Sequence, residues 1–174
     1  MLHLSNVNSI AYRWGAAALM FAAGAVLLAL GIEHLGGYRP CPLCLQQRWA
    51  YYAGVPVLFG ALLAFSMHKP RLAGALFAIA ALMFLANAGL GVYHAGAEWK
   101  FWPGPDTCSG ADGLATSAGS LLERLQNTRV VRCDEAALRV AGLSLAGWNV
   151  IASLMLCTAG IKAALATRDL EQYL

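Results

Sequence analysis

Charged side chains divide the chain into long apolar runs. Four runs of 19 to 26 residues contain no Asp, Glu, Lys or Arg. As an α-helix, each run is long enough to cross roughly 30 Å of hydrocarbon. The pattern therefore predicts four membrane-spanning helices, at about residues 14–32, 47–67, 72–93 and 145–166.

The flanks of these runs refine the predicted spans. A cleaved signal peptide is the alternative for the first span, but its apolar run exceeds the usual length of about 7–15 residues and no small-residue cleavage site follows. Pro56 lies inside the second span and is expected to kink the helix rather than end it. Only residues 68–71 separate the second span from the third, so these two must form an antiparallel hairpin.

Two segments then share one side of the membrane, at residues 33–46 and 94–144. A Gly-Gly pair and Pro40 exclude a continuous helix in the first segment. The second opens with an aromatic interfacial turn at residues 99–105. Farther on, apolar residues at helical spacing predict a short amphipathic helix, lying either flat in the interface or packed on its own loop. These residues are Leu114, Ala118, Leu121, Leu122 and Leu125.

The composition excludes several classes of protein. With 59% hydrophobic and 12% charged residues, the chain is neither disordered nor a small disulfide-stapled domain. A net charge of +3 without a block of Lys or Arg argues against a nucleic-acid partner. We expect an all-α membrane protein in which residues 1–174 form a single four-span membrane domain, a four-helix transmembrane bundle with two loops on one side.

Four of the five cysteines fall in the two loops that share a side, Cys41 and Cys44 in the first and Cys108 and Cys133 in the second. Two cysteine pairs outside the helices fit an oxidising compartment, which makes both loops periplasmic. The basic turn between the second and third spans is then cytoplasmic, as are both termini, in a multi-pass protein of the bacterial inner membrane. Cys157 lies mid-span and is interpreted as a small buried hydrophobe.

The C-x-x-C motif of the first loop serves several chemistries. A c-type haem motif needs His after the second cysteine, where a leucine stands, and a thioredoxin domain needs a βαβ context that this chain lacks. Zinc would use all four loop cysteines, but Cys108 and Cys133 lack the close spacing of a zinc knuckle, so no metal site is expected. Two inert structural disulfides remain open as the alternative to a reactive pair.

Neighbouring residues favour a reactive pair. Cys44 lies at the predicted N-terminus of the second span, where unpaired backbone N–H groups favour a thiolate. Arg48 follows one helical turn later, where it could stabilise that thiolate and donate hydrogen bonds to a carbonyl oxygen of a lipid-borne ligand. An arginine that reaches out to lipid headgroups is the alternative. His94 ends the third span on the same side, and Glu33 and His34 end the first.

With these motifs the chain resembles the disulfide bond formation protein B (DsbB) family, inner-membrane quinone reductases that reoxidise the periplasmic dithiol oxidase DsbA. The resemblance covers almost the whole chain, with four spans, a short first loop and a long second loop. Its motifs are Pro40-Cys41-x-x-Cys44 with Arg48, Tyr93-His94, Trp102-Pro103-Gly104-Pro105 leading to Cys108, then Cys133, and Gly142-Leu143-Ser144 with Trp148.

The resemblance implies a route for electrons through two disulfides. Cys41 and Cys44 would form the disulfide that quinone regenerates. Cys108 and Cys133 would form the disulfide presented to the partner, with Cys108 attacked by the partner's thiolate. Exchange between Cys133 and Cys41 would then pass the electrons to Cys44, next to quinone.

The resemblance also implies the ligands and partners. Arg48 would hold the quinone, with His94 assisting. The implied partners are a DsbA-like periplasmic thiol oxidase and membrane quinone, ubiquinone rather than menaquinone, with the respiratory chain reached through the quinone.

Other functions remain open at this stage. One is a non-catalytic membrane assembly protein whose two disulfides only fix its loops, and another is a paralogue of the same fold that serves a dedicated partner. A vitamin K epoxide reductase-like protein uses similar thiol and quinone chemistry, but its loop cysteines are expected before its C-x-x-C motif, the reverse of the order found here.

Overall fold

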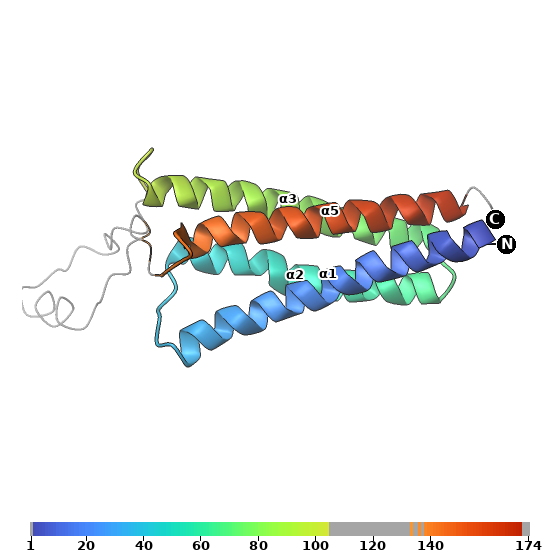
Figure 1. Cartoon of the computed structure of the whole chain (residues 1–174), viewed down its shortest axis with the longest axis horizontal. Helices are drawn as coiled ribbons and strands as arrows, with labels where there is room; N and C mark the ends of the chain where they lie inside the picture. Colours follow the sequence, from blue (N-terminus) through green and yellow to red (C-terminus); the bar gives the residue numbers. More distant parts are fainter. Residues whose placement is uncertain (1, 105–132, 134–135, 137, 172–174) are drawn as a thin grey trace, which may run out of the picture.

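The computed structural model describes residues 2–104, 133, 136 and 138–171, and these residues are almost entirely helical. The chain forms α1 (Leu2–His34), α2 (Pro42–Ser66), α3 (Pro70–Glu98) and α5 (Leu145–Glu171), with a hairpin of β1 (Arg139–Val140) and β2 (Leu143–Ser144) directly before α5. The four helices run side by side along the long axis of the molecule (Figure 1).

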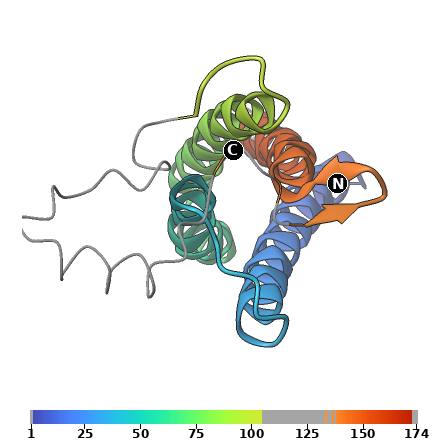
Figure 2. The same ribbon diagram turned by 90° about the vertical axis from the view of Figure 1, so that its left-hand side faces the viewer.

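The helices pack as a ring of four. α2 packs against α1 and α3, and α5 packs against α3 and α1, an arrangement visible in the view along the helices (Figure 2). Each helix contains a stretch that is long and apolar enough to cross a membrane. The predicted all-α fold with a four-helix transmembrane bundle is therefore confirmed, and α2 and α3 form the predicted antiparallel hairpin.

The two ends of the bundle carry different parts of the chain. At one end lie the connection from α1 to α2 and the C-terminus of α3 (Figure 1). At the other end lie the start of α1, the turn from α2 to α3 and the end of α5. The two predicted loops therefore leave the bundle from the same end, because alternate connections of antiparallel helices share a side.

All four helices extend beyond the predicted spans: α1 begins at Leu2 rather than near residue 14, and α5 ends at Glu171 rather than near residue 166. Two further differences bear on the cysteines. α2 begins at Pro42 rather than near residue 47, because proline suits the first turn of a helix and Cys41 caps it. The Cys41 sulfur accepts a hydrogen bond from the backbone N–H of Cys44 at 3.2 Å. α3 continues to Glu98, past the predicted end at residue 93. Both Cys44 and His94 therefore belong to helices rather than to loop ends.

The chain after α3 turns back onto that helix. The ring of Trp102 stacks on Tyr93 with ring centroids 6.0 Å apart, and Trp102 Nε1 donates a hydrogen bond to the Tyr93 carbonyl at 2.9 Å. The described part of this segment is thus the aromatic turn that the sequence predicts. The amphipathic helix predicted between Leu114 and Leu125 lies outside the described residues.

The hairpin of β1 and β2 is an element that the sequence did not predict. Its turn residues Ala141 and Gly142 both have positive φ, 51° and 83°, which is the backbone of a tight two-residue hairpin turn. Glycine adopts this conformation without a steric penalty. The indole Nε1 of Trp148 donates to the Val140 carbonyl at 3.0 Å and so ties the hairpin to the first turn of α5.

Small side chains let the helices approach closely. The buried core consists mostly of alanines, and the rings of Phe77 and Phe84 fill the space between them. A Cβ atom added at Gly54 of α2 would lie 2.6 Å from the Phe84 ring of α3. Without water to be expelled, such close packing is the main attraction between helices in a membrane.

We therefore expect Gly54→Ala to destabilise the bundle by about 1–3 kcal/mol, because the added methyl group forces Phe84 out of its position. The measurement is the thermal unfolding of the purified protein in detergent, followed by helical circular dichroism. Gly89→Ala is the matched control, since a Cβ there meets nothing within 4 Å. Equal melting temperatures for the two variants would contradict close packing at Gly54.

Candidate functional site

The C-x-x-C motif folds as the cap and first turn of α2. Cys41 has extended backbone angles, φ −74° and ψ 164°, and precedes the helix, whereas Cys44 lies within its first turn. This brings the two sulfur atoms to 2.9 Å from one another, with both cysteines as free thiols. Cys41 is buried and Cys44 is half-buried. The pair is therefore poised to form a disulfide with little movement of the backbone.

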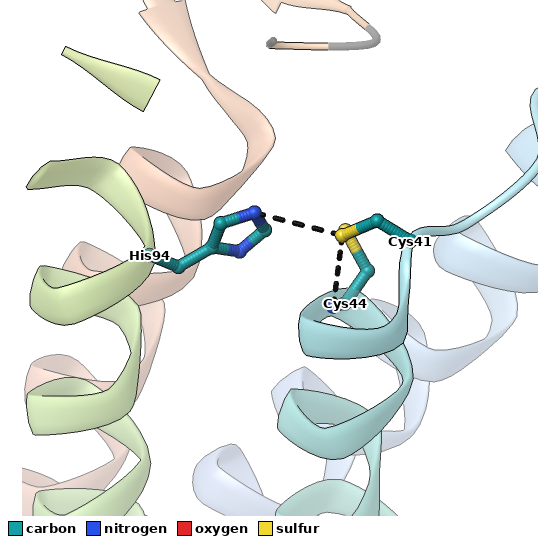
Figure 3. A group of neighbouring side chains, drawn as sticks. All are labelled: Cys41, Cys44 and His94. Carbon is teal, nitrogen blue, oxygen red and sulfur yellow. Dashed lines mark hydrogen bonds between the residues drawn. The ribbon is translucent and has the colours of Figure 1, made fainter. Parts of the chain in front are cut away.

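The site also includes a histidine from the neighbouring helix. His94, near the end of α3, is only 2% exposed, and its Nε2 lies 3.6 Å from the Cys41 sulfur. Figure 3 shows the ring of His94 pointing from α3 toward the two cysteines at the start of α2. The structure thus brings His94 to the thiol pair, as the sequence suggested, and places it beside Cys41 rather than Cys44.

The surroundings of Cys41 favour its thiolate. The hydrogen bond from the Cys44 thiol, the Nε2 of His94 and the backbone N–H of Cys44 together hold the pKa of the Cys41 thiol well below its usual range, although burial opposes this. The sequence assigned the helix N-terminal amide groups to Cys44. The helix starts earlier than predicted, so the amide of Cys44 stabilises the sulfur of Cys41 instead.

The distance between the sulfur atoms favours thiol chemistry over metal binding. Two thiolates bound to one tetrahedral zinc ion at about 2.3 Å each would be about 3.8 Å apart. The sulfur atoms of Cys41 and Cys44 are closer, at 2.9 Å, and share a hydrogen bond. Their geometry is that of a dithiol about to become a disulfide.

Cys133 lies next to the thiol pair although it is distant in sequence. It is 1% exposed and packs in one apolar cluster with Cys41 and Leu43, against which the half-buried Cys44 and Leu90 also rest. Cys133 is disulfide-bonded. Cys108, its predicted partner, lies outside the described residues. A cysteine of the second loop is thus within the same cluster as the C-x-x-C motif, as an exchange between loops requires.

Arg48 points toward α1 instead of toward the thiol pair. Its guanidinium donates to the carboxylate of Glu33, and its second terminal nitrogen lies 3.5 Å from the Ala29 carbonyl. Both side chains of the ion pair are mostly covered, with 16% of Arg48 and 26% of Glu33 exposed. Among the described contacts, none joins Arg48 to Cys44, so the predicted stabilisation of a Cys44 thiolate has no direct contact behind it.

This ion pair joins two helices where they separate. α1 diverges from the other helices toward the end that carries the thiol pair (Figure 1). The ion pair between Glu33 and Arg48 joins α1 to α2 at this end, one helical turn beyond Cys44 along α2. The sequence placed Glu33 only at the end of the first span, and its contact with Arg48 emerges from the structure.

Two further polar residues of the site were missed at the level of sequence. Gln47 is buried and its amide nitrogen lies 3.0 Å from His94 Nδ1. Glu98, whose side chain is 5% exposed, has one carboxylate oxygen 3.7 Å from His94 Nε2, and no partner within the described residues for the other. The sequence did contain a clue to both residues, because a polar side chain in or at the end of an apolar run is a candidate functional residue in a membrane segment.

Comparisons with known proteins agree on one family. The family model described as "Disulfide bond formation protein DsbB" matches residues 12–163. A disulfide bond formation protein B from Xanthomonas oryzae pv. oryzae is 33% identical over 168 residues, covering 87% of this chain and 94% of that protein. One from Marinobacter nauticus is 29% identical over 150 residues, covering 82% and 84%. No solved structure gives a significant match.

Proposed function

The chain belongs to the DsbB family of disulfide bond formation proteins, and we propose that it reoxidises a DsbA-like periplasmic thiol oxidase and passes the electrons to membrane quinone. The observation that carries this proposal is the cluster of Cys41, Cys44 and His94, with Cys133 packed against it. A purely structural pair of cysteines needs neither a stabilised thiolate nor a second disulfide within the same cluster.

The electrons follow two thiol–disulfide exchanges. A thiolate of the reduced partner attacks Cys108 and releases Cys133 as a thiolate, which then attacks the Cys41–Cys44 disulfide at Cys41. This attack frees Cys44 as a thiol. The partner's second thiol then resolves its mixed disulfide with Cys108, and the Cys108 thiolate attacks Cys133, which reforms the Cys108–Cys133 disulfide and releases Cys41. The burial of Cys133 beside Cys41 supports this order, because the two sulfurs that must react lie in one cluster.

The last step reforms the disulfide between Cys41 and Cys44. The dithiol loses two electrons and two protons, and a quinone takes up both to become a quinol. Cys41 is a good leaving group when Cys108 reforms its disulfide with Cys133, since its lowered pKa stabilises the thiolate that is released. In this proposal Arg48 holds a quinone carbonyl oxygen by hydrogen bonds and His94 assists from α3, with ubiquinone as the acceptor.

The same proposal assigns a location and an orientation. The thiol end of the bundle faces the periplasm, and the opposite end, with the start of α1 and the end of α5, faces the cytoplasm of a bacterial inner membrane. An oxidising periplasm is the compartment in which a disulfide-generating site operates. The basic turn between α2 and α3, which includes Lys69 and Arg71, then lies at the cytoplasmic end. The count of Lys and Arg, seven on the thiol side and five on the other, does not decide the orientation, which rests on the cysteines.

The experiment is a coupled assay with the purified protein in detergent. Reduced DsbA-like oxidase and a soluble ubiquinone analogue are added, and quinone absorbance is followed. We expect quinone to disappear in proportion to the partner thiols oxidised, and only when all three components are present. A menaquinone analogue in parallel tests the choice of quinone. If the partner's thiols stay reduced with either quinone, the proposed activity is wrong.

A further inference from the structure

A line of buried polar side chains continues from the thiol site into the bundle. The side chains come from three helices and contact one another there, and all but one are buried. They are Gln47 and Tyr51 of α2, Asn87 of α3, and Ser153 and the half-buried Asn149 of α5. In an apolar bundle an unsatisfied amide is costly, so each polar atom is expected to have a partner. These contacts therefore determine which atoms donate and which accept.

The deep end of the line orients Asn149. Its Oδ1 accepts a hydrogen bond from the Tyr51 hydroxyl at 2.7 Å and lies 3.3 Å from the amide nitrogen of Asn87. With its oxygen committed to two donors, Asn149 directs its Nδ2 toward α2. There it donates to the Oε1 of Gln47 at 2.8 Å. The side-chain amide of Asn149 is thus held in one orientation by two helices.

Gln47 carries this orientation to the histidine. Because its Oε1 accepts from Asn149, its Nε2 is the atom that faces His94, at 3.0 Å from Nδ1. An amide nitrogen only donates, so Nδ1 of His94 must accept and carries no proton. A neutral imidazole then holds its single proton on Nε2.

The other side of the ring leads independently to the same assignment. Nε2 of His94 lies 3.6 Å from the Cys41 sulfur and 3.7 Å from an oxygen of Glu98. A thiolate and a carboxylate are both acceptors, so the nitrogen between them is the one that bears hydrogen. Both faces of the imidazole therefore favour the Nε2–H form.

We propose that Asn149, acting through Gln47, is a positioning residue that holds His94 as the Nε2–H tautomer and so keeps a hydrogen-bond donor aimed at the Cys41 sulfur. This inference rests on the proposed function only in giving Cys41 a redox role. Among the described residues, the titratable groups facing Cys41 are Cys44 from α2 and His94 from α3, with Glu98 facing His94 from one turn later.

The arrangement has a chemical purpose. A neutral donor stabilises the Cys41 thiolate without requiring a second buried charge, an imidazolium, beside it. The reverse tautomer would point a bare ring nitrogen at the sulfur, which gives a thiolate no stabilisation. Asn149 therefore affects the Cys41 sulfur through Gln47 and His94 without touching it.

The first test is the pH dependence of alkylation of Cys41 in the fully reduced protein, using iodoacetamide and peptide mass spectrometry. Asn149→Leu and Gln47→Leu are expected to raise the apparent pKa of Cys41 by about one unit, a roughly tenfold smaller thiolate fraction below that pKa. Thr158→Ala is the control, because Thr158 belongs to the same helix as Asn149 but is exposed and donates to the Met155 carbonyl. Its profile should match that of the unmodified protein.

The second test reads the tautomer directly and needs no variant of the relay. The protein labelled with ¹⁵N-histidine gives ring-nitrogen signals, of which the His94 pair is identified by its loss in His94→Gln. We expect a protonated Nε2 and an unprotonated Nδ1. A protonated Nδ1, or an alkylation profile unmoved in Asn149→Leu, would overturn the proposal. Neither measurement uses quinone or the partner, so both can be interpreted even if the proposed oxidase activity fails.

Discussion

Replacing Cys44 with alanine is expected to reduce quinone-linked turnover to background, because a single sulfur cannot supply two electrons and close a disulfide. Cys41→Ala is expected to have the same effect, since the two sulfurs 2.9 Å apart form one redox unit. The measurement is the coupled quinone assay with the reduced partner. Cys157→Ala is the control, a core cysteine whose loss should leave turnover intact at a cost of at most about 1–2 kcal/mol in stability.

The Cys44→Ala variant should accumulate one particular disulfide. In Cys44→Ala, the remaining Cys41 thiolate can attack Cys133 of the proposed Cys108–Cys133 disulfide and release Cys108 as a thiolate, because Cys133 lies in the same buried cluster. No second thiol in the first loop resolves the product. We therefore expect a disulfide between Cys41 and Cys133, found by peptide mapping under non-reducing conditions. A folded Cys44→Ala protein without this linkage would mean that electrons do not pass between the loops through these two cysteines.

The helices were predictable from sequence because their cause is local. A run of about twenty residues without charge crosses a membrane as a helix whatever its neighbours are, and all four such runs are helices. Helix ends were less accurate. Pro42 and Cys41 extend α2 toward the first loop, since proline fits the first turn and a sulfur can cap it. This shift moved the favourable amide group from Cys44 to Cys41.

The contacts between helices could not be read from the sequence in the same way. The residues of the ion pair, Glu33 and Arg48, lie in different helices, and nothing local indicates that α1 turns its last carboxylate toward α2. Gln47 and Asn149 are separated by 102 positions, and their hydrogen bond depends on the rotation of α5 against α2. Gln47 and Asn149 carry no charge, so the pattern of charged residues does not distinguish them from their apolar neighbours. Only packing shows that they share one network with His94.

Arg48→Leu is expected to raise the apparent KM for quinone by about 10- to 150-fold. A hydrogen bond from a charged group is worth about 1.5–3 kcal/mol, and the substitution removes the guanidinium that would bind the quinone oxygen. Arg48→Lys keeps the charge without the planar fork, so a smaller increase is expected. Exchange between the reduced partner and the oxidised protein, measured in one turnover without quinone, should change little in either variant.

The ion pair with Glu33 supplies the control that separates binding from structure. Glu33→Gln removes the partner charge but leaves the guanidinium in place with a neutral acceptor, so KM for quinone should stay within about threefold of the unmodified value. If Arg48 only fastens α1 to α2, then Arg48→Leu and Glu33→Gln should both lower the melting temperature and neither should alter KM. That outcome would remove Arg48 from the quinone site. An increase in KM confined to the Arg48 variants would instead mean that the guanidinium binds the quinone whether or not the residue at position 33 carries a charge.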